Sequence, residues 1–276
     1  QRAKEFFDSI LYIPITKIHV ETVENKSIPY FKDINLLETD VILPRVNKKD
    51  IDLYDVLLQI FERNKKILIP FSNNAVHYGY NEFLVPFMLS KAGILAPKTY
   101  FSLSRVALEK KLSTIIYPIL VKLPYSKKGT IVLDSESSAK GVMDTLEILG
   151  QPITLQETYE NAIPLSILVI GSKAYAVKGK GEPYELSNSE KNIVITASRT
   201  FETKLCQINA IKTDNNLFLI IGMDIKPKIN AFEEAYNKKL IDLTLRYLHK
   251  EARNKIENNV MSKFLKWFED KRWGEK

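Results

Sequence analysis

Residues 205–225 read LCQINAIKTDNNLFLIIGMDI, two apolar runs on either side of four polar residues. Leu205–Lys212 and Leu217–Ile225 have the length and the β-branched content that are typical of strands. The segment between them, Thr213–Asn216, consists of residues that tolerate the backbone of a tight turn. The stretch therefore predicts an antiparallel hairpin, and a helix expected over residues 231–250 follows it.

Short strands and one helix are predicted on the N-terminal side of this hairpin. The helix covers residues 137–149 and ends at Gly150. A second hairpin is expected to turn at Gly171-Ser172. The segments expected as strands are Ile119–Leu123, Thr130–Leu133, Thr154–Glu157, Ile167–Ile170 and Lys173–Val177. Strands joined by tight turns indicate an α+β unit with antiparallel pairing.

The first 96 residues have a different pattern, in which strands and helices alternate. An amphipathic helix is predicted from Asp50 to Lys66, because its apolar residues recur at helical spacing. Other helices are expected over residues 2–10 and Asn81–Ala92. The expected strands are Leu11–Val20, Asp40–Arg45 and Ile67–Pro70. This alternation predicts an α/β unit with a parallel sheet.

Length and composition restrict the class of protein. A chain of 276 residues with 45% hydrophobic and 26% charged residues is globular and has the size of about two domains. Its one cysteine, Cys206, excludes a disulfide framework and a Cys-rich zinc site. No apolar run is long enough to span a membrane, and the first residues lack a secretory signal. We therefore expect a cytoplasmic protein with no membrane partner.

The net charge of +7 favours acidic partners: nucleotide phosphates, nucleic acid or an acidic protein tail. Lys127-Lys128 lies on one predicted turn, and Lys178 and Lys180 lie on another. General catalytic signatures are missing, since the sequence has no GxxxxGK[ST] phosphate loop and its three histidines share no metal-ligand spacing.

Several motifs occur in a fixed order between about Asp40 and Lys250. They are Asp40-Val-Ile-Leu-Pro-Arg45, Phe71-Ser-Asn-Asn74, Lys91 to Thr99, Tyr117 to Lys122, Leu155-Gln-Glu157, Leu168 to Gly171, Ser187-Asn188 and Gly222 to Pro227. Their order and spacing resemble the ATP-grasp superfamily, most closely the branch that contains the ribosomal-protein glutamate ligase and the carrier-protein ligases of lysine biosynthesis.

The resemblance implies an ATP-grasp fold of mixed α/β and α+β class. An N-terminal pre-ATP-grasp α/β lobe is expected over residues 1–96. The ATP-grasp domain follows over residues 97–252, with a small central lobe to about residue 155 and a C-terminal lobe from about residue 156. A C-terminal amphipathic helix is expected over residues 253–276.

The resemblance also implies ATP in a cleft between the lobes, with magnesium between the phosphates. Lys122 ends a predicted strand where the family's lysine reaches the phosphates. Gln156 and Glu157 match the hinge that holds adenine, and Ser187 and Asn188 match a pair near the phosphates.

The metal site departs from the family pattern. By spacing, the first carboxylate of the family falls at Asn209, the second at Gly222, and the family's asparagine at Asp224. Asp224 with Asn209 is therefore the expected metal site, and it is incomplete. Other positions differ as well: Ser166 replaces an arginine, Pro164 an aspartate, Pro124–Gly129 a glycine-rich loop, and Asn81-Glu82 an Asp-Lys pair.

Family members use ATP to activate a carboxylate as an acyl phosphate, which an amine then attacks. The resemblance, together with the positions at which this sequence departs from the family pattern, leaves three possible functions. The first is a divergent nucleotide-binding protein with weak or lost ligase activity, a pseudoenzyme. The second is an active carboxylate–amine ligase with a rearranged metal site, in which Glu185 or Asp224 supplies the missing carboxylate. The third is a nucleic-acid- or protein-binding module on a vestigial ATP-grasp fold.

The two ends of the chain also differ from the family. Residues 2–10 already predict a helix, so the strand that normally opens the first lobe is expected to be missing. A second helix is predicted over residues 255–268, with an apolar stripe. The stripe consists of Ile256, Val260, Met261, Phe264, Leu265, Trp267 and Phe268. We expect it to pack on the N-terminal lobe; a dimer interface through this helix, or a partner protein, is the alternative.

Overall fold

The computed structural model describes residues 2–45, 47–81, 83–123 and 130–273, with side chains of the last helix described to residue 262. The chain divides into two compact units. Unit 1 contains residues 1–73 and 237–276, and unit 2 contains residues 74–236. Unit 2 contains the expected central lobe and the expected C-terminal lobe up to residue 236, whereas residues 237–252 of that lobe belong to unit 1 and residues 74–96 of the expected N-terminal lobe belong to unit 2.

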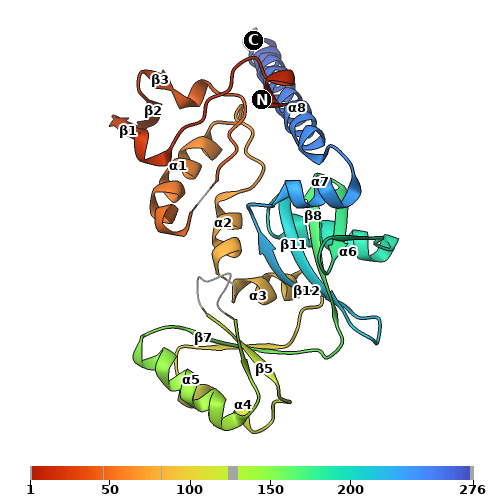
Figure 1. The fold of residues 1–276 in the computed structure, drawn as a ribbon. Helices are drawn as coiled ribbons and strands as arrows, with labels where there is room; N and C mark the ends of the chain where they lie inside the picture. Colours follow the sequence, from red (N-terminus) through yellow and green to blue (C-terminus); the bar gives the residue numbers. More distant parts are fainter. Residues whose placement is uncertain (1, 46, 82, 124–129, 274–276) are drawn as a thin grey trace. The chain divides into compact units, whose positions relative to one another are not determined.

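The larger sheet of unit 2 has five antiparallel strands in the order β10-β9-β8-β11-β12 (Figure 1). These are β8 (Ile163–Ile170), β9 (Lys173–Lys178), β10 (Glu182–Tyr184), β11 (Leu205–Lys212) and β12 (Phe218–Asp224). Both predicted hairpins are confirmed, β8–β9 and β11–β12. The helices α6 (Asn188–Thr200) and α7 (Ile229–Tyr236) belong to the same lobe.

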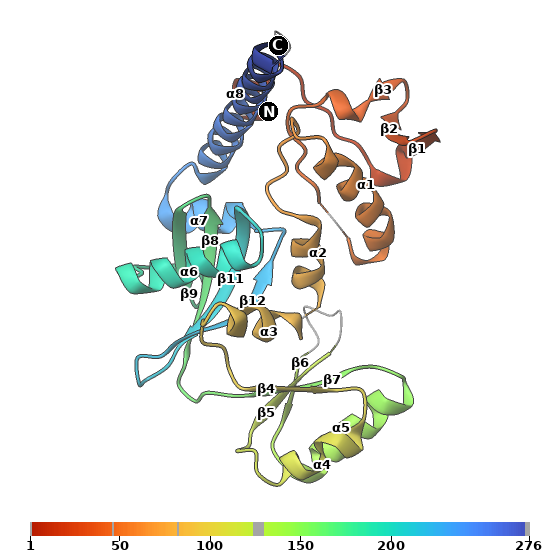
Figure 2. The ribbon, with the colours of Figure 1, turned by 180° about the vertical axis from the view of Figure 1, so that it is seen from behind.

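The smaller sheet of unit 2 has four antiparallel strands in the order β4-β7-β5-β6. They are β4 (Thr99–Ser102), β5 (Ile119–Lys122), β6 (Thr130–Leu133) and β7 (Ile153–Glu157). One face of this sheet is covered by α4 (Arg105–Leu112) and α5 (Glu136–Ile148), which share its apolar core (Figure 2). The strands and the helix predicted for this region are confirmed, and Gly150 follows α5 with a φ of +64°.

Unit 1 has a small antiparallel sheet in the order β1-β2-β3. Its elements are β1 (Ile18–Val23), β2 (Lys26–Phe31), β3 (Ile34–Asn35), α1 (Ile51–Arg63) and α8 (Leu240–Trp273), with 3₁₀ turns at Arg2–Glu5, Ile15–Lys17, Leu36–Glu38 and Lys48–Asp50. Helix α1 confirms the helix predicted from Asp50, whereas only one short 3₁₀ turn forms in residues 2–10.

The predicted parallel sheet is wrong for the residues described. Asp40–Arg45 and Ile67–Pro70 meet only through a single parallel bridge between Val41 and Leu68. Each segment ends at or next to a proline, Pro44 or Pro70, and proline has no N–H group with which to extend a ladder. For the same reason the strand expected over residues 11–20, which contains Pro14, begins only at Ile18.

The helix expected over Asn81–Ala92 begins later than predicted, and a further helix precedes it. The structure has α2 (Asn73–Tyr80) and α3 (Leu84–Lys91) on either side of residue 82. In α2, a Cβ atom at Gly79 would lie 3.2 Å from Ile225 Cγ2, so glycine allows the close approach of this helix to the residue after β12. That contact is long-range, and local propensity gives no sign of it.

The helix predicted over residues 231–250 is divided between α7 and α8, and α8 continues without a break through the helix predicted over residues 255–268. Leu248 and Ala252 pack with Leu68, and Lys255 Nζ donates a hydrogen bond to the Ile67 carbonyl oxygen at 2.6 Å. Helix α8 therefore packs on the N-terminal segment through residues that precede the predicted apolar stripe.

The outer part of the predicted apolar stripe is exposed where it is described. Val260 is 63% exposed and Met261 is 58% exposed. The side chains of Phe264, Leu265, Trp267 and Phe268 lie outside the described residues. No helix in the described part of the chain is long and apolar enough to cross a membrane.

Replacing Leu248 with Ala should destabilise unit 1 by about 2–5 kcal/mol, because it opens a cavity in the contact between α8 and Leu68. Val260→Ala is the matched control on the same helix, with an expected change below about 0.5 kcal/mol because the side chain is exposed. Chemical denaturation followed by circular dichroism measures both. Equal effects of the two substitutions would contradict the packing described here.

Candidate functional site

The face of the smaller sheet that α4 and α5 do not cover carries polar side chains. The core under α4 and α5 contains Val121 and Leu155, so the alternate residues on these strands point to the other face. Lys122 lies opposite Thr154 in the register of β5 and β7, and Gln156 lies opposite Leu120. The face without helices therefore presents Lys122, Thr154 and Gln156 together.

Lys122 connects this face to the larger sheet. Its Nζ atom donates a hydrogen bond to the Ile221 carbonyl oxygen on β12 at 2.9 Å. The register of β11 and β12 shifts at this point, since Asn209 pairs with Gly222 and Ala210 with Ile220. Ile221 is thus the extra residue of a bulge, and its carbonyl group accepts a donor from outside the hairpin.

The two predicted hinge residues point in opposite directions. Gln156 is 4% exposed, and its Nε2 atom donates to Thr99 Oγ1 at 3.0 Å. Glu157 forms an ion pair with Lys98 at 3.4 Å, and its backbone N–H donates to the Lys98 carbonyl oxygen. These contacts fix the end of β7, the segment from which the adenine contacts are expected.

The Ser187 side chain caps helix α6. Its Oγ atom accepts the backbone N–H of Glu190, while the Glu190 carboxylate accepts the backbone N–H of Ser187, a complete capping box. Asn188 is the first residue of the helix. The hydroxyl that the sequence places near the phosphates thus has a structural partner at the N-terminus of α6.

Glu190 also forms a buried ion pair with Lys212 on β11, at 2.8 Å. Burial alone would raise the pKa of Glu190, but the hydrogen bonds from Lys212 and Ser187 outweigh it and hold the pKa below its usual range. The pair ties the start of α6 to the sheet. Sequence reasoning missed it, although Ser187 followed three residues later by Glu190 is a readable capping signal.

The positions expected to hold the metal lie in one row across the larger sheet. Ser166 pairs with Asn209 between β8 and β11, and Asn209 pairs with Gly222 between β11 and β12. Gln207 and Asp224 form the adjacent pair two residues along, on the same face. The structure therefore brings Asn209, Gly222 and Asp224 to one surface.

The side chains of this row form a neutral hydrogen-bond network. Asn209 Oδ1 accepts Gln207 Nε2 at 2.9 Å, and Ser166 Oγ lies 3.5 Å from the same oxygen. Gln207 was not identified from the sequence; its spacing of two residues from Asn209 on a strand is the signal that places both on one face.

The row does not fit a magnesium site. Magnesium favours carboxylate oxygens in octahedral geometry. The row of Ser166, Asn209 and Gly222 has no carboxylate, and Asp224, in the neighbouring pair on the same face, has an Oδ1 atom that already accepts the backbone N–H of Lys226 at 2.8 Å. The oxygen of Asn209 is bonded to Gln207, and Gly222 has no side chain. Across the described residues, no three His, Cys, Asp or Glu side chains gather in an arrangement that could hold a metal ion.

The single cysteine lies on the opposite face of β11. Cys206 is fully buried and its Sγ atom lies 3.9 Å from Ser198 Oγ on α6. Burial raises the pKa of the thiol to about 12, so the reactive thiolate is not populated at neutral pH. Cys206 is thus a core residue and not a nucleophile.

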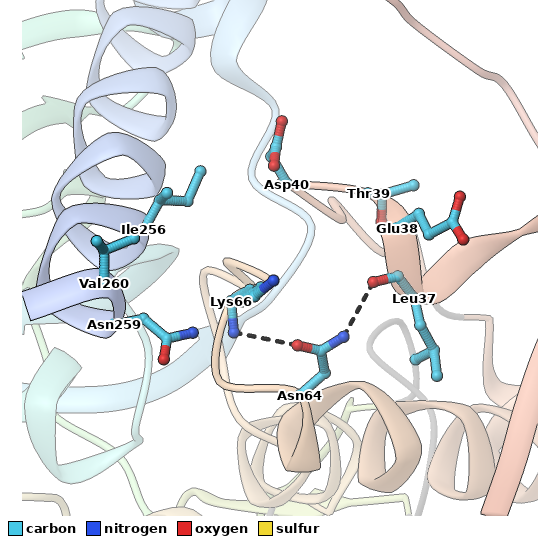
Figure 3. Close-up of a pocket in the computed structure, with 9 residues that line it drawn as sticks. All are labelled: Leu37, Glu38, Thr39, Asp40, Asn64, Lys66, Ile256, Asn259 and Val260. Carbon is cyan, nitrogen blue, oxygen red and sulfur yellow. Dashed lines mark hydrogen bonds between the residues drawn. The ribbon is translucent and has the colours of Figure 1, made fainter. Parts of the chain in front are cut away.

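Unit 1 contains a separate cavity of about 480 Å³ (Figure 3). Helix α8 contributes the Ile256 and Val260 side chains to one wall, and Asn64 on the other side donates a hydrogen bond to the Leu37 carbonyl oxygen. None of the site residues predicted from the sequence lines this cavity.

Comparison with known proteins gives one family and several relatives. The family described as RimK-like ATP-grasp domain matches residues 80–247. A probable alpha-L-glutamate ligase of Legionella pneumophila (strain Corby) is 26% identical over 187 residues, which cover 60% of this chain and 62% of the relative. The chain thus spans about three fifths of the length of that relative.

Two solved structures share the fold. The ATP-grasp ligase PsnB, complexed with precursor peptide PsnA2 and AMPPNP, has a TM-score of 0.68 at 13% identity and covers 85% of this chain and 84% of PsnB. A RiPP-associated ATP-grasp ligase of Chryseobacterium gregarium, in complex with ADP and a leader and core peptide, has a TM-score of 0.66 at 11% identity and covers 92% of both chains.

Replacing Glu190 with Gln should lower the free energy of unfolding by about 1–3 kcal/mol at pH 7, because Lys212 loses its partner inside the protein. The pKa of Glu190 is lowered by folding, so its contribution is present above the ordinary value of 4.5 and is lost as the pH falls through the folded value. The variant should therefore lose less stability than the parent protein between about pH 5 and pH 3.

Glu182→Gln is the matched control, because Glu182 forms an exposed ion pair with Lys178 at 3.4 Å. Its expected effect is below about 0.5 kcal/mol at either pH. Urea denaturation across the pH range measures both variants. A parallel pH dependence for Glu190→Gln and the parent protein would show that Glu190 has no such role.

Proposed function

The chain belongs to the RimK-like ATP-grasp family, and on this premise we propose that it binds an adenine nucleotide between the two sheets of unit 2 and has lost ordinary ligase activity. The observation that carries the proposal is the contrast between two neighbouring positions. The Lys122 ammonium group is kept beside β12, whereas the adjacent row of Ser166, Asn209 and Gly222 has no carboxylate.

The retained lysine supports nucleotide binding. An ammonium group held at the junction of the two sheets supplies positive charge for phosphate oxygens. Gln156 and Glu157 lie on β7, the strand next to β5, and their contacts order the segment expected to hold adenine. The two solved neighbours are complexes with AMPPNP and with ADP, which supports an adenine nucleotide as the ligand proposed for this chain.

The missing carboxylates support the loss of ligation. The relatives are named as probable glutamate ligases, and ligases of this family form an acyl phosphate by phosphoryl transfer. Such transfer depends on metal ions that neutralise the charge developing on the transferred group. Asp224 alone, already engaged with a backbone N–H, is a poor support for that step.

An active ligase with a rearranged metal site is the second candidate, because Asp224 lies on the same face as the row. It predicts that Asp224 is needed for activity. The nucleic-acid module has less support: Lys178 forms an ion pair with Glu182, and Lys127 and Lys128 lie outside the described residues.

Replacing Lys122 with Met removes the ammonium group and keeps most of the apolar stem. We expect ATP affinity to fall about 10- to 100-fold, the range for a charge-assisted hydrogen bond. Lys173→Met, at an exposed position of β9, is the control and should leave the affinity unchanged. Calorimetric titration measures both, and unchanged affinity in Lys122→Met would rule out the phosphate role of this lysine.

Ligase activity should stay at background level with ATP, magnesium and glutamate, measured as ADP release and as amide formation by mass spectrometry. The reason is that the row at Asn209 and Gly222 has no carboxylate for the metal ions. A glutamate-dependent burst of ADP that disappears in Asp224→Asn would support the second candidate and contradict the loss of ligation.

A further inference from the structure

We infer that the row formed by Ser166, Asn209 and Gly222 is a phosphate-binding surface, and that the nucleotide is bound there without magnesium. The inference rests on the nucleotide binding proposed above. It concerns whether the bound nucleotide carries a magnesium ion. The row lacks carboxylates, and in addition it presents a hydrogen-bond donor, the NH₂ group of Asn209.

The orientation of the Asn209 amide is set by its neighbours. In the structure Gln207 Nε2 donates to Asn209 Oδ1 at 2.9 Å, so this oxygen faces Gln207. Ser166 Oγ, at 3.5 Å, lies near the same oxygen. The Asn209 NH₂ group is therefore turned away from Gln207, and an amide nitrogen can only donate.

The Asn209 NH₂ group points toward the place where a side chain on residue 222 would begin. A Cβ atom built on Gly222 would lie 3.8 Å from Asn209 Nδ2, and no other heavy atom of the described residues outside its chain neighbours comes within 4 Å of that place. Where the family pattern has two metal-binding carboxylates, this chain has a hydrogen-bond donor beside an open position. A donor binds anions, not cations.

A positively charged side chain lies beside the row, at the residue that precedes Gly222. The Lys122 ammonium group bonds to the carbonyl oxygen of Ile221, the residue next to Gly222. Asp224 is an acidic group on the same face, two residues along β12, and its Oδ1 atom accepts the backbone N–H of Lys226. A phosphate oxygen at Gly222 would thus meet an amide donor and an ammonium group.

In sites lined by carboxylates, magnesium lies between the carboxylates and the phosphates and so offsets the repulsion between these negative groups. Asn209 and Gly222 remove that repulsion. Metal-free ATP should therefore bind this chain about as well as its magnesium complex.

Calorimetric titration of the full chain with ATP tests the inference, once in EDTA and once in excess magnesium. We expect the two Kd values to agree within about threefold. Binding that requires magnesium would overturn the inference and leave the proposed nucleotide function standing. No binding under either condition would instead overturn the proposed function, so the two failures are distinguishable.

A charge-restoring variant makes the test sharper. Gly222→Glu places a carboxylate in the open position, and in EDTA we expect it to weaken ATP binding at least tenfold. Gly222→Gln is the matched control, because it has nearly the same volume and no charge, and it should change the Kd in EDTA much less. Thermal denaturation checks that both variants fold. Equal weakening by Glu and Gln would show that space alone decides binding, and would overturn the phosphate assignment.

Discussion

The hydrogen bond from the Lys122 ammonium group to the Ile221 carbonyl oxygen depends on a bulge in β12. Because Ile221 is the extra residue of that bulge, its carbonyl group accepts a donor that comes from the other sheet. A long cationic side chain is thereby held at a defined position, where side chains of this type would otherwise sample many rotamers. The proposed nucleotide contacts and the role of the neutral row both depend on where this ammonium group lies.

Gln207 is not proposed to contact the nucleotide, yet it affects which atoms the row presents to a ligand. Gln207 bonds to the oxygen of Asn209 and so determines which end of that amide is presented. The same asparagine with its amide reversed would offer an oxygen to a cation. In the proposed phosphate site, selection of an anion over a cation thus depends on one supporting hydrogen bond, in the way that outer residues orient the ligands of metal sites.

The parts of the fold that the sequence predicts well are those with local signals. The hairpins of the larger sheet turn at residues with left-handed backbone, Gly171 and Asn216, both with a φ of +61°, and such turns are visible in composition. The spacing of the motifs placed Asn209 and Gly222 at the two carboxylate positions of the family's metal site, and in the structure these two residues are paired across β11 and β12. Helix α2 and the bulge at Ile221 were not predictable, because each depends on contacts between segments far apart in the chain.

Unit 1 is assembled from residues 1–73 and 237–276, with the whole of unit 2 between them in sequence. During synthesis the N-terminal segment therefore leaves the ribosome long before α8, whose Leu248 and Ala252 cover Leu68. Unit 2, which is continuous in sequence, is able to fold first. Residues 1–73 build one apolar cluster of their own, around Leu57 and Phe61, but Leu68 stays uncovered until α8 is made. Completion of unit 1 therefore waits for α8, and during this interval the surface around Leu68 is the part of the nascent chain that a chaperone would cover.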